Sequence, residues 1–272
     1  MQNRVFGLIG NPIKHSFSKT YFENKFSSLH YNNCRYELFE LKCIEDLSIL
    51  LKKEKDLQGL NVTSPYKIQI LNYLDSISED AKEIGAVNTI KIQNNKLIGY
   101  NTDWIGFLLS LKNETDIKNI HSTLILGTSG AAKAVGYALK SQNIKHLYVT
   151  RKDSLVDLGI DPNSNNPNTY SNHIDTLANG STISYKQLNR MENFSIFDLI
   201  INATPCGMAT YPPIADIDTN KITPSQIVFD LIYNPSQTLL LKTAKEKGCR
   251  TINGLQMLYN QADASWNIWS NN

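Results

Sequence analysis

A lysine and an aspartate stand where predicted strands give way to helices. Lys67 ends the segment Asn-Val-Thr-Ser-Pro-Tyr-Lys, in which Ser64 fits the N-cap and Pro65 the first position of a helix. Lys67 then lies in the first helical turn, where the helix dipole disfavours its charged form and makes it a better proton donor or acceptor. Asp103 precedes the predicted helix Trp104–Leu111 and supplies a fixed carboxylate. The alternatives are a solvated lysine and an aspartate that only caps its helix.

Two hydroxyls, those of Ser16 and Ser18, follow the predicted buried strand Val5–Ile9 and stand at the start of another helix. Ser16 fits the N-cap, and a helix start also favours an anion. The two hydroxyls can therefore hold an anion, and capping alone is the alternative. His15 is expected in a turn or at the surface, because no second metal-ligating residue keeps suitable spacing with it.

These side chains must be positioned by the ends of strands. The segments Gly10–Ser18, Asn61–Lys67 and Asn101–Asp103 each connect a predicted strand to a helix. In an open α/β sheet such corners share one edge and line one crevice. Asn88, inside an apolar strand, needs a hydrogen-bond partner if it is buried. The combination suits a small hydroxylated acid as ligand.

A second kind of corner lies in the middle of the chain. The apolar run Thr123–Leu126 is followed by Gly-Thr-Ser-Gly at 127–130 and then by an Ala-rich helical pattern. A strand, a glycine turn and a helix form the phosphate-binding corner of nucleotide folds. The second glycine of the dinucleotide pattern is replaced by Ser129, so an ordinary strand-to-helix turn is the alternative.

The end of the next strand predicts which dinucleotide binds. The strand His146–Thr150 leads into Arg151 and Lys152. An acidic residue at this point binds the ribose 2′-hydroxyl of NAD, whereas a basic residue accommodates the 2′-phosphate of NADP. The basic pair favours NADP, although Asp153 is an acid close by.

Composition indicates a soluble globular protein. The chain has 272 residues, 41% of them hydrophobic and 19% charged, with a net charge of +2. These values predict one or two domains and give no case for nucleic acid or a membrane as partner. The four cysteines are scattered and form no C-x-x-C pair, which argues against zinc and against a disulfide framework. No metal is expected, and a reducing cytoplasm is the default compartment. The Asn-rich stretch 162–179 is expected to be a surface loop.

The C-terminal part continues the alternation of strands and helices. Strands are expected over Phe197–Ile201 and Ile227–Leu231, and helices over Leu239–Lys247 and Gly254–Trp269. Gln261 flanks the apolar stripe of the last helix and can face a cleft. The whole pattern predicts an α/β protein with a parallel nucleotide-binding sheet.

Taken in order, the motifs resemble those of the shikimate dehydrogenases of the NADP-dependent, biosynthetic type. They are HSFSK, NVTSPYK, GAVNT, NTDWIGF, GTSGAAKA, NATPCGM, DLIYNP and NGLQML with NQA, and they run the length of the chain. The second and sixth are specific to that family and its close relatives. The set is therefore much more specific than the glycine corner alone.

The resemblance implies a two-domain α/β enzyme. Residues 1–104, completed by the C-terminal helix 238–272, would form the substrate-binding domain, and residues 105–237 a Rossmann-like NADP domain. It also implies reversible reduction of 3-dehydroshikimate to shikimate by NADPH, a step in chorismate and aromatic amino acid biosynthesis. The protein would act in the cytoplasm as a monomer or homodimer.

The resemblance also assigns roles to individual residues. Lys67 and Asp103 would be catalytic, with Lys67 carrying the proton. The substrate would be bound by Ser16, Ser18, Thr63, Lys67, Asn88, Asp103, Tyr233 and Gln261. The cofactor would be bound by Glu79, Gly127, Thr128, Ser129, Gly130, Ala131, Thr150, Arg151, Lys152, Leu231, Gly254 and Met257.

Two departures from the family pattern bear on the cofactor. Ser129 replaces a middle glycine of the loop, and Thr150-Arg151-Lys152 replaces the usual Asn-Arg-Thr. One rival hypothesis is a quinate or dual quinate/shikimate dehydrogenase, with NAD as an alternative cofactor. Another is a non-catalytic binding protein that kept the fold, which the presence of Lys67 and Asp103 disfavours.

Overall fold

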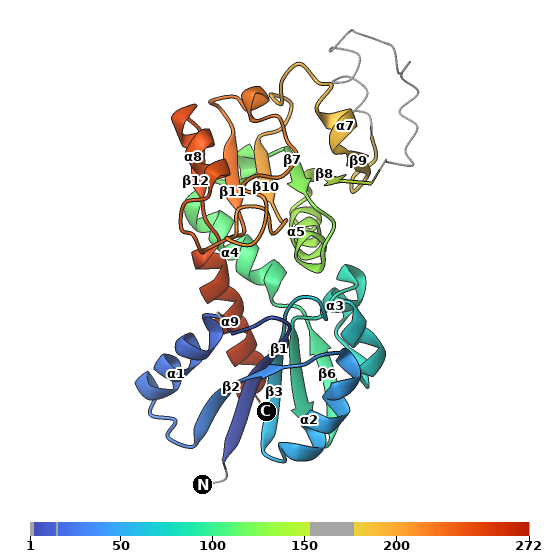
Figure 1. Ribbon diagram of the computed structural model, residues 1–272, viewed down its shortest axis with the longest axis vertical. Helices are drawn as coiled ribbons and strands as arrows, with labels where there is room; N and C mark the ends of the chain where they lie inside the picture. Colours follow the sequence, from blue (N-terminus) through green and yellow to red (C-terminus); the bar gives the residue numbers. More distant parts are fainter. Residues whose placement is uncertain (1–2, 15, 153–176, 272) are drawn as a thin grey trace. The chain divides into compact units, whose positions relative to one another are not determined.

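A computed structural model describes residues 3–14, 16–152 and 177–271. His15, Asp153 and most of the Asn-rich stretch 162–179 lie outside the described residues, and the expectations for them stay predictions. The chain forms two compact units, Met1–Gly106 with Tyr259–Asn272, and Phe107–Leu258 (Figure 1). No described helix combines the length and apolar character needed to span a bilayer.

The first unit is built on a six-stranded sheet in the order β2-β1-β3-β5-β6-β4. Its strands are β1 (Arg4–Gly10), β2 (Cys34–Glu40), β3 (Leu57–Val62), β4 (Ser76–Ile77), β5 (Thr89–Gln93) and β6 (Lys96–Tyr100). β1 is parallel to β2 and β3, and β5 is antiparallel to both β3 and β6. As predicted, the carboxyl ends of β1, β3 and β6 therefore lie at one edge.

Helices cover both faces of this sheet because successive side chains of a strand point to opposite faces. Phe6 of β1 packs with α1 (Ser18–Ser28) and with the end of α9 (Leu255–Ser270), whereas Val5 and Ile9 pack with α2 (Leu47–Lys53). The burial of each Phe or Leu side chain contributes about 1.5–3 kcal/mol to the stability of the folded state. The remaining helical segments of this unit are η1 (Ile44–Asp46), η2 (Gln69–Tyr73), α3 (Glu79–Ile84) and the start of α4 (Asp103–Glu114).

The second unit is built on six parallel strands in the order β12-β11-β10-β7-β8-β9. They are β7 (Ser122–Leu126), β8 (Lys145–Thr150), β9 (Thr182–Ser184), β10 (Leu199–Asn202), β11 (Ile227–Asp230) and β12 (Arg250–Ile252). Counted from β7 as the first strand, this is the order 3-2-1-4-5-6 of doubly wound dinucleotide-binding sheets. The order reverses between β7 and β10, where such sheets bind their ligand.

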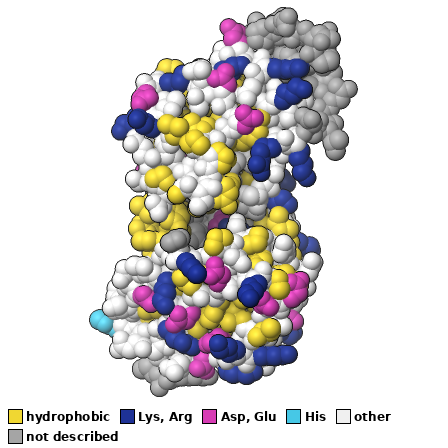
Figure 2. All heavy atoms as spheres, viewed as in Figure 1, with side chains coloured by type: hydrophobic (Ala, Val, Ile, Leu, Met, Phe, Trp, Pro, Cys, Tyr) yellow, Lys and Arg dark blue, Asp and Glu magenta, His cyan; other side chains and the backbone are white. Residues whose placement is uncertain are grey.

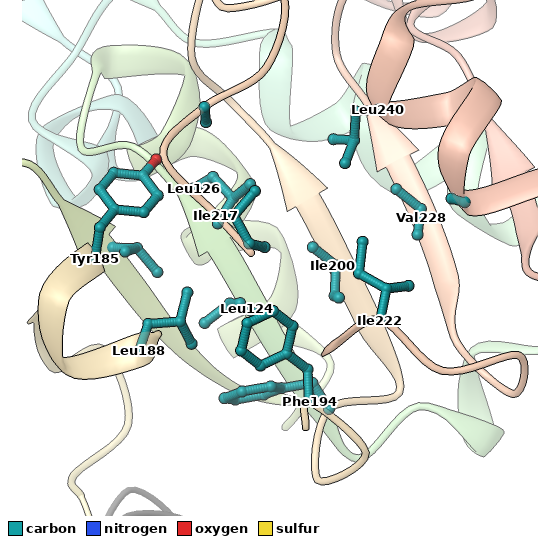
Figure 3. Close-up of a cluster of buried hydrophobic side chains, with 14 of the residues drawn as sticks. Leu124, Leu126, Tyr185, Leu188, Phe194, Ile200, Ile217, Ile222, Val228 and Leu240 are labelled. Atoms are coloured by element: carbon teal, nitrogen blue, oxygen red, sulfur yellow. The ribbon is translucent and has the colours of Figure 1, made fainter. Parts of the chain in front are cut away.

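The core of the second unit joins neighbouring strands to short helices. Leu124, Ile200 and Val228 come from β7, β10 and β11 and lie side by side in Figure 3. Leu188 of α7 (Tyr185–Leu188) and Leu240 of α8 (Leu239–Glu246) close the cluster. The unit also holds η3 (Ile117–Asn119), η4 (Thr219–Lys221) and α5 (Gly130–Ser141). These strands are apolar runs because both sheet faces are covered.

The units differ from the predicted domains chiefly in residues 238–258, which were predicted to belong to the substrate-binding domain. They lie in the second unit, because β12 pairs with β11 and α8 packs into the same core. The shortest strands, β4, β9 and β12, were not predicted, since two or three residues carry no periodic pattern.

Two local predictions were wrong. Residues 64–68 form turns that lead into η2, so no helix begins at Ser64, and Lys67 does not lie at the N-terminus of a regular helix. The N-cap of α1 is Phe17 rather than Ser16. In the first of these segments, the carbonyls of Ser64 and Lys67 accept hydrogen bonds from the N–H groups of Asn11 and Val87, and local propensity does not report such long-range contacts.

Figure 2 shows how charge is distributed on the visible face. Lys and Arg side chains lie among Asp and Glu side chains over the first unit, as the near-zero net charge suggests.

Candidate active site

The candidate substrate site lies at the edge of the first sheet where β1, β3 and β6 end. The Thr63 N–H donates to the Ile9 carbonyl at 2.9 Å, which joins the corner after β3 to β1. The Asn88 N–H donates to the Tyr100 carbonyl at 3.1 Å, which joins the start of β5 to the end of β6. Because β1 and β3 are parallel and β6 runs in the same direction, the sheet brings together corners that lie far apart in the sequence.

Lys67 and Asp103 form an ion pair at this edge. The Lys67 ammonium donates to Oδ2 of Asp103 at 2.6 Å, and their side chains are 19% and 8% exposed. The Val87 N–H donates to the Lys67 carbonyl at 2.8 Å, which fixes the backbone of the turn. Lys67 therefore owes its position to Asp103 and to the strand edge, and the helix-dipole argument does not apply. The pair offers a proton on one side and a carboxylate to orient it on the other.

Asn88 fixes the orientation of Asp103. Its side chain is 2% exposed, and its Nδ2 donates to Oδ1 of Asp103 at 2.8 Å and to Thr102 Oγ1 at 2.9 Å. Its Oδ1 accepts the Thr102 N–H at 2.7 Å. Both carboxylate oxygens of Asp103 thus have donors. The partner that a buried Asn88 required is present, and Gln261 Oε1 lies 3.4 Å from the same Nδ2.

Ser16 and Ser18 lie at the start of α1 and are partly exposed. Ser16 Oγ accepts the Ser18 N–H at 3.3 Å, so it bonds the first residue of the helix although it is not the N-cap. The first turn of α1 contains no acidic residue. Thr63 is also partly exposed, and a Cβ at Gly10 would lie 2.4 Å from its methyl group, so Gly10 lets the two corners approach.

The second unit contains the predicted glycine corner, directly after β7. Gly127 has φ +105°, and a Cβ there would lie 3.0 Å from Thr204 Cγ2 and 3.3 Å from the Ala203 carbonyl. Ser129 is the N-cap of α5: its Oγ accepts the Ala132 N–H at 3.3 Å and donates to the Ala203 carbonyl at 3.3 Å. The serine that replaces the middle glycine therefore starts the helix and joins the loop to β10.

The corner fits a dinucleotide pyrophosphate. Thr128 and Ser129 are exposed, Gly130 is the buried first residue of α5, and Ala131 is partly exposed. Small residues at the N-terminus of a twelve-residue helix leave room for an anion and favour its charge.

At the end of β8, Thr150 is partly exposed, while Arg151 and Lys152 are exposed. Thr150 Oγ1 accepts the Lys152 N–H at 3.3 Å, which orders the turn that carries the basic pair. Two unburied cations at the end of the second strand fit a 2′-phosphate.

The residues predicted near the nicotinamide, Leu231, Gly254 and Met257, follow β11 and β12. The Gly254 N–H donates to the Ile232 carbonyl at 3.1 Å, and a Cβ at Gly254 would lie 2.0 Å from the Leu231 carbonyl oxygen. Only glycine permits this approach. Met257 lies in the first turn of α9 and is 7% exposed, and Tyr233 is partly exposed.

Three residues at this edge were missed by the sequence interpretation. Asp230 is fully buried; its Oδ1 accepts Asn202 Nδ2 at 2.9 Å, and its Oδ2 accepts the Thr238 hydroxyl at 2.6 Å. Burial raises the pKa of Asp230 to about 6, against the hydrogen bonds from Thr238, the Ile232 N–H and Asn202. Asn202 and Asp230 begin the motifs NATPCGM and DLIYNP, and Thr238 follows the second motif, but no local pattern indicates that the three side chains contact one another.

The predicted site residues fall into both units. Ser16, Ser18, Thr63, Lys67, Asn88, Asp103 and Gln261 belong to the first unit, and Tyr233 belongs to the second. Glu79 is exposed at the first position of α3 in the first unit, whereas the other predicted cofactor residues lie in the second. The roles assigned to these residues stay predictions.

A doubly wound parallel sheet with a glycine corner, in one chain with an α/β unit that carries a lysine–aspartate pair, defines the class of two-unit α/β dehydrogenases. Residues 8–90 match the family model described as the shikimate dehydrogenase substrate binding domain. A shikimate dehydrogenase (NADP(+)) of Methanococcus aeolicus is 38% identical over 275 residues, covering 99% of this chain and 92% of that protein. The chain belongs to the shikimate dehydrogenase family.

Solved structures agree with this assignment. A crystal structure of a shikimate dehydrogenase in complex with NADP+ has a TM-score of 0.80 and 34% identity, with 98% of this chain and 90% of that chain covered. The Thermus thermophilus enzyme in complex with NADP(H) and shikimate has a TM-score of 0.79 and 27% identity, with 98% and 93% covered. The predicted family and fold class are therefore confirmed.

Proposed function

We propose that the protein is an NADP-dependent shikimate dehydrogenase, an oxidoreductase that interconverts 3-dehydroshikimate and shikimate. The observation that carries the proposal is the ion pair of Lys67 and Asp103 at the edge of the substrate-domain sheet. The names of its relatives and the ligands bound in the similar structures support the choice of substrate and cofactor.

In this proposal Lys67 moves the proton. NADPH supplies the hydride when it is bound. In reduction the Lys67 ammonium gives a proton to the oxygen of the reacting carbon, and in oxidation the neutral amine accepts it. Asp103 keeps Nζ in one place through the 2.6 Å hydrogen bond, and Asn88 keeps Asp103 in place. Positioned acid–base help of this kind is worth about 10²–10⁴-fold in rate.

The other residues bind and orient. The hydroxyls of Ser16 and Ser18 hold the substrate carboxylate, while Thr63, Asn88, Tyr233 and Gln261 contact the ring hydroxyls. Residues 127–131 hold the pyrophosphate, and Thr150, Arg151 and Lys152 hold the 2′-phosphate. Leu231, Gly254 and Met257 line the nicotinamide side, with Glu79 as a further cofactor contact.

The test is one assay that follows the absorbance of the reduced nicotinamide. Shikimate and quinate are each offered with NADP and with NAD. We expect the highest kcat/KM for shikimate with NADP. If none of the four combinations gives turnover, the proposal that the protein is such an enzyme is rejected. A higher kcat/KM for quinate would instead assign the protein to quinate oxidation.

We also propose that the protein acts in the cytoplasm as a monomer or homodimer. Its four cysteines, Cys34, Cys43, Cys206 and Cys249, are all free, as in a reducing compartment. Light scattering after size exclusion gives the mass directly, and a value other than about 31 or 61 kDa would contradict the proposed assembly, because one chain has a mass of 30.7 kDa.

A further inference from the structure

Three buried hydroxyls form a triangle inside the first unit. They belong to Thr89 in β5, Thr102 in the segment before α4 and Ser265 in α9, and all three side chains are fully buried. Ser265 Oγ lies 2.8 Å from Thr89 Oγ1 and 3.1 Å from Thr102 Oγ1, and the two threonine oxygens are 3.2 Å apart. Buried polar groups need partners, and in this hydroxyl triangle they are partners of one another.

The two threonines of the hydroxyl triangle fix the side-chain amide of Asn88. Thr102 Oγ1 accepts from Asn88 Nδ2 at 2.9 Å, and the Thr89 hydroxyl donates to Asn88 Oδ1 at 3.1 Å. The same Nδ2 donates its other proton to Asp103 Oδ1 at 2.8 Å. Because an amide group is planar, contacts at its two ends decide its tilt, and the tilt directs the N–H at Asp103. The triangle is thus connected to the ion pair through Asn88.

Ser265 connects the hydroxyl triangle to two further groups. Its hydroxyl donates to the Gln261 carbonyl, one turn back in α9, at 2.9 Å, which leaves its oxygen able to accept. That oxygen accepts Asn61 Nδ2 at 3.0 Å. The Tyr36 hydroxyl donates to Asn61 Oδ1 at 2.7 Å, which turns the amide nitrogen of Asn61 toward Ser265. Contacts from β3, β5, α9 and the segment before α4 therefore meet at one oxygen.

We propose that Ser265 is a positioning residue for the Lys67–Asp103 pair. Its oxygen holds the two threonine hydroxyls of the triangle, the threonines fix the amide of Asn88, and Asn88 orients Asp103. The inference rests on the proposed function, since it assumes that the ion pair carries the proton. A hydroxyl suits this position because it can donate once and accept twice, and because it adds no charge close to the Asp103 carboxylate.

Removal of the Ser265 oxygen has a defined consequence for Asn88. In Ser265→Ala the two threonine hydroxyls lose a partner that a buried site does not replace. The Asn88 Oδ1 atom is the acceptor that remains for both, at 3.1 Å from Thr89 Oγ1 and 3.2 Å from Thr102 Oγ1. It already accepts the Thr102 N–H at 2.7 Å. We therefore expect the amide of Asn88 to shift, together with the N–H that it directs at Asp103.

The first test is Ser265→Ala, assayed as shikimate oxidation with NADP. We expect kcat to fall about 3- to 10-fold, the effect of about one hydrogen bond, with KM for NADP within twofold of wild type. Ser270→Ala is the matched control: Ser270 also lies in α9 and donates to the carbonyl four residues back, that of Trp266, at 2.8 Å, and its other hydrogen bond goes to Asn267, outside the triangle. Its kinetic constants should equal those of the wild type. Unfolding midpoints are measured on the same samples, and both variants should fold because Ala favours a helix.

The second test separates positioning from a merely structural role. A displaced Asp103 slows the proton transfer at Lys67, so the solvent isotope effect on kcat should be larger in Ser265→Ala than in the wild type. Ser265→Ala should also lower kcat by less than twofold in an Asp103→Asn background, yet show its full effect in a Ser16→Ala background. An unchanged solvent isotope effect, or equal effects on kcat in both backgrounds, would overturn the inference.

Thr89→Val is a second variant that removes another hydroxyl of the triangle without changing α9. It should also lower kcat, and its combination with Ser265→Ala should lower kcat by less than the product of the two single effects, because both act on Asn88. If the wild type turns over no shikimate with NADP, the proposed function and this inference both fall. If the wild type is active and neither variant lowers kcat, the inference alone falls.

Discussion

The buried carboxyl group of Asp230 predicts a pH-dependent change in stability. Asp230 ends β11 in the second unit, and burial raises its pKa from 3.8 to about 6. In the unfolded chain the carboxyl group of Asp230 has the lower pKa, 3.8. Between the two values the folded protein binds more protons than the unfolded chain, so the free energy of unfolding falls as the pH rises. The loss of stability that comes from ionising the buried Asp230 is absent at pH values below 3.8 and complete at pH values above about 6.

The size of the penalty follows from the shift. About two pKa units correspond to about 3 kcal/mol, since one unit is worth about 1.4 kcal/mol. Asp230→Asn removes the titration and can keep the contacts. Its carbonyl oxygen can still accept from Asn202 and the Ile232 N–H, and its amide can donate to the Thr238 hydroxyl, which already accepts from the Leu241 N–H.

The assay is urea unfolding of the wild type and Asp230→Asn from pH 4 to pH 8, followed by circular dichroism. The three tryptophans, Trp104, Trp266 and Trp269, all lie in the first unit, so their fluorescence gives a separate record of that unit. As the pH rises from 4 to 7, we expect the free energy of unfolding of the variant to increase relative to that of the wild type by up to about 3 kcal/mol. A difference in unfolding free energy that stays constant over this range would refute the reasoning.

Three further predictions concern the proposed reaction, its cofactor and the stability of α5. Lys67→Ala should lower kcat by about 10²–10⁴-fold with a modest change in KM, and a near-normal kcat would remove Lys67 from proton transfer. Arg151→Ala should raise KM for NADPH by about 10-fold or more while leaving KM for NADH nearly unchanged; equal effects on both would count against a 2′-phosphate contact. Ser129→Ala should lower the free energy of unfolding by about 0.5–2 kcal/mol in urea titrations, because α5 loses its N-cap, and an unaltered midpoint would contradict that role.

Much of the fold was readable because strands and helices leave local patterns. The apolar run of β7 and the Ala-rich helix after it were predicted, and both are present with Gly127 between them. The edge shared by β1, β3 and β6 was also predicted, since parallel strands end together. The segment around Lys67 was misjudged because Ser64 and Pro65 imitate a helix start, whereas the carbonyls of Ser64 and Lys67 accept hydrogen bonds from residues 11 and 87, which are distant in the sequence.

Ser129 shows the limit of local patterns most clearly. In the sequence it is only a departure from a glycine motif, without an evident reason. In the structure it caps α5 and donates to the carbonyl of Ala203, a residue just after β10. No spacing rule relates two residues so far apart, so only the folded loop could explain the substitution.

The sequence by itself determined which elements form and which side chains stand at their ends, because backbone preference and hydrophobic period act over a few residues. It therefore placed Lys67, Asp103 and the Ser16–Ser18 pair at the ends of strands. Only the tertiary structure decided which of them touch and what holds them. Tyr36, Asn61 and Ser265 become neighbours because packing buries their polar groups together, and buried donors and acceptors must then pair with whatever the fold brings near.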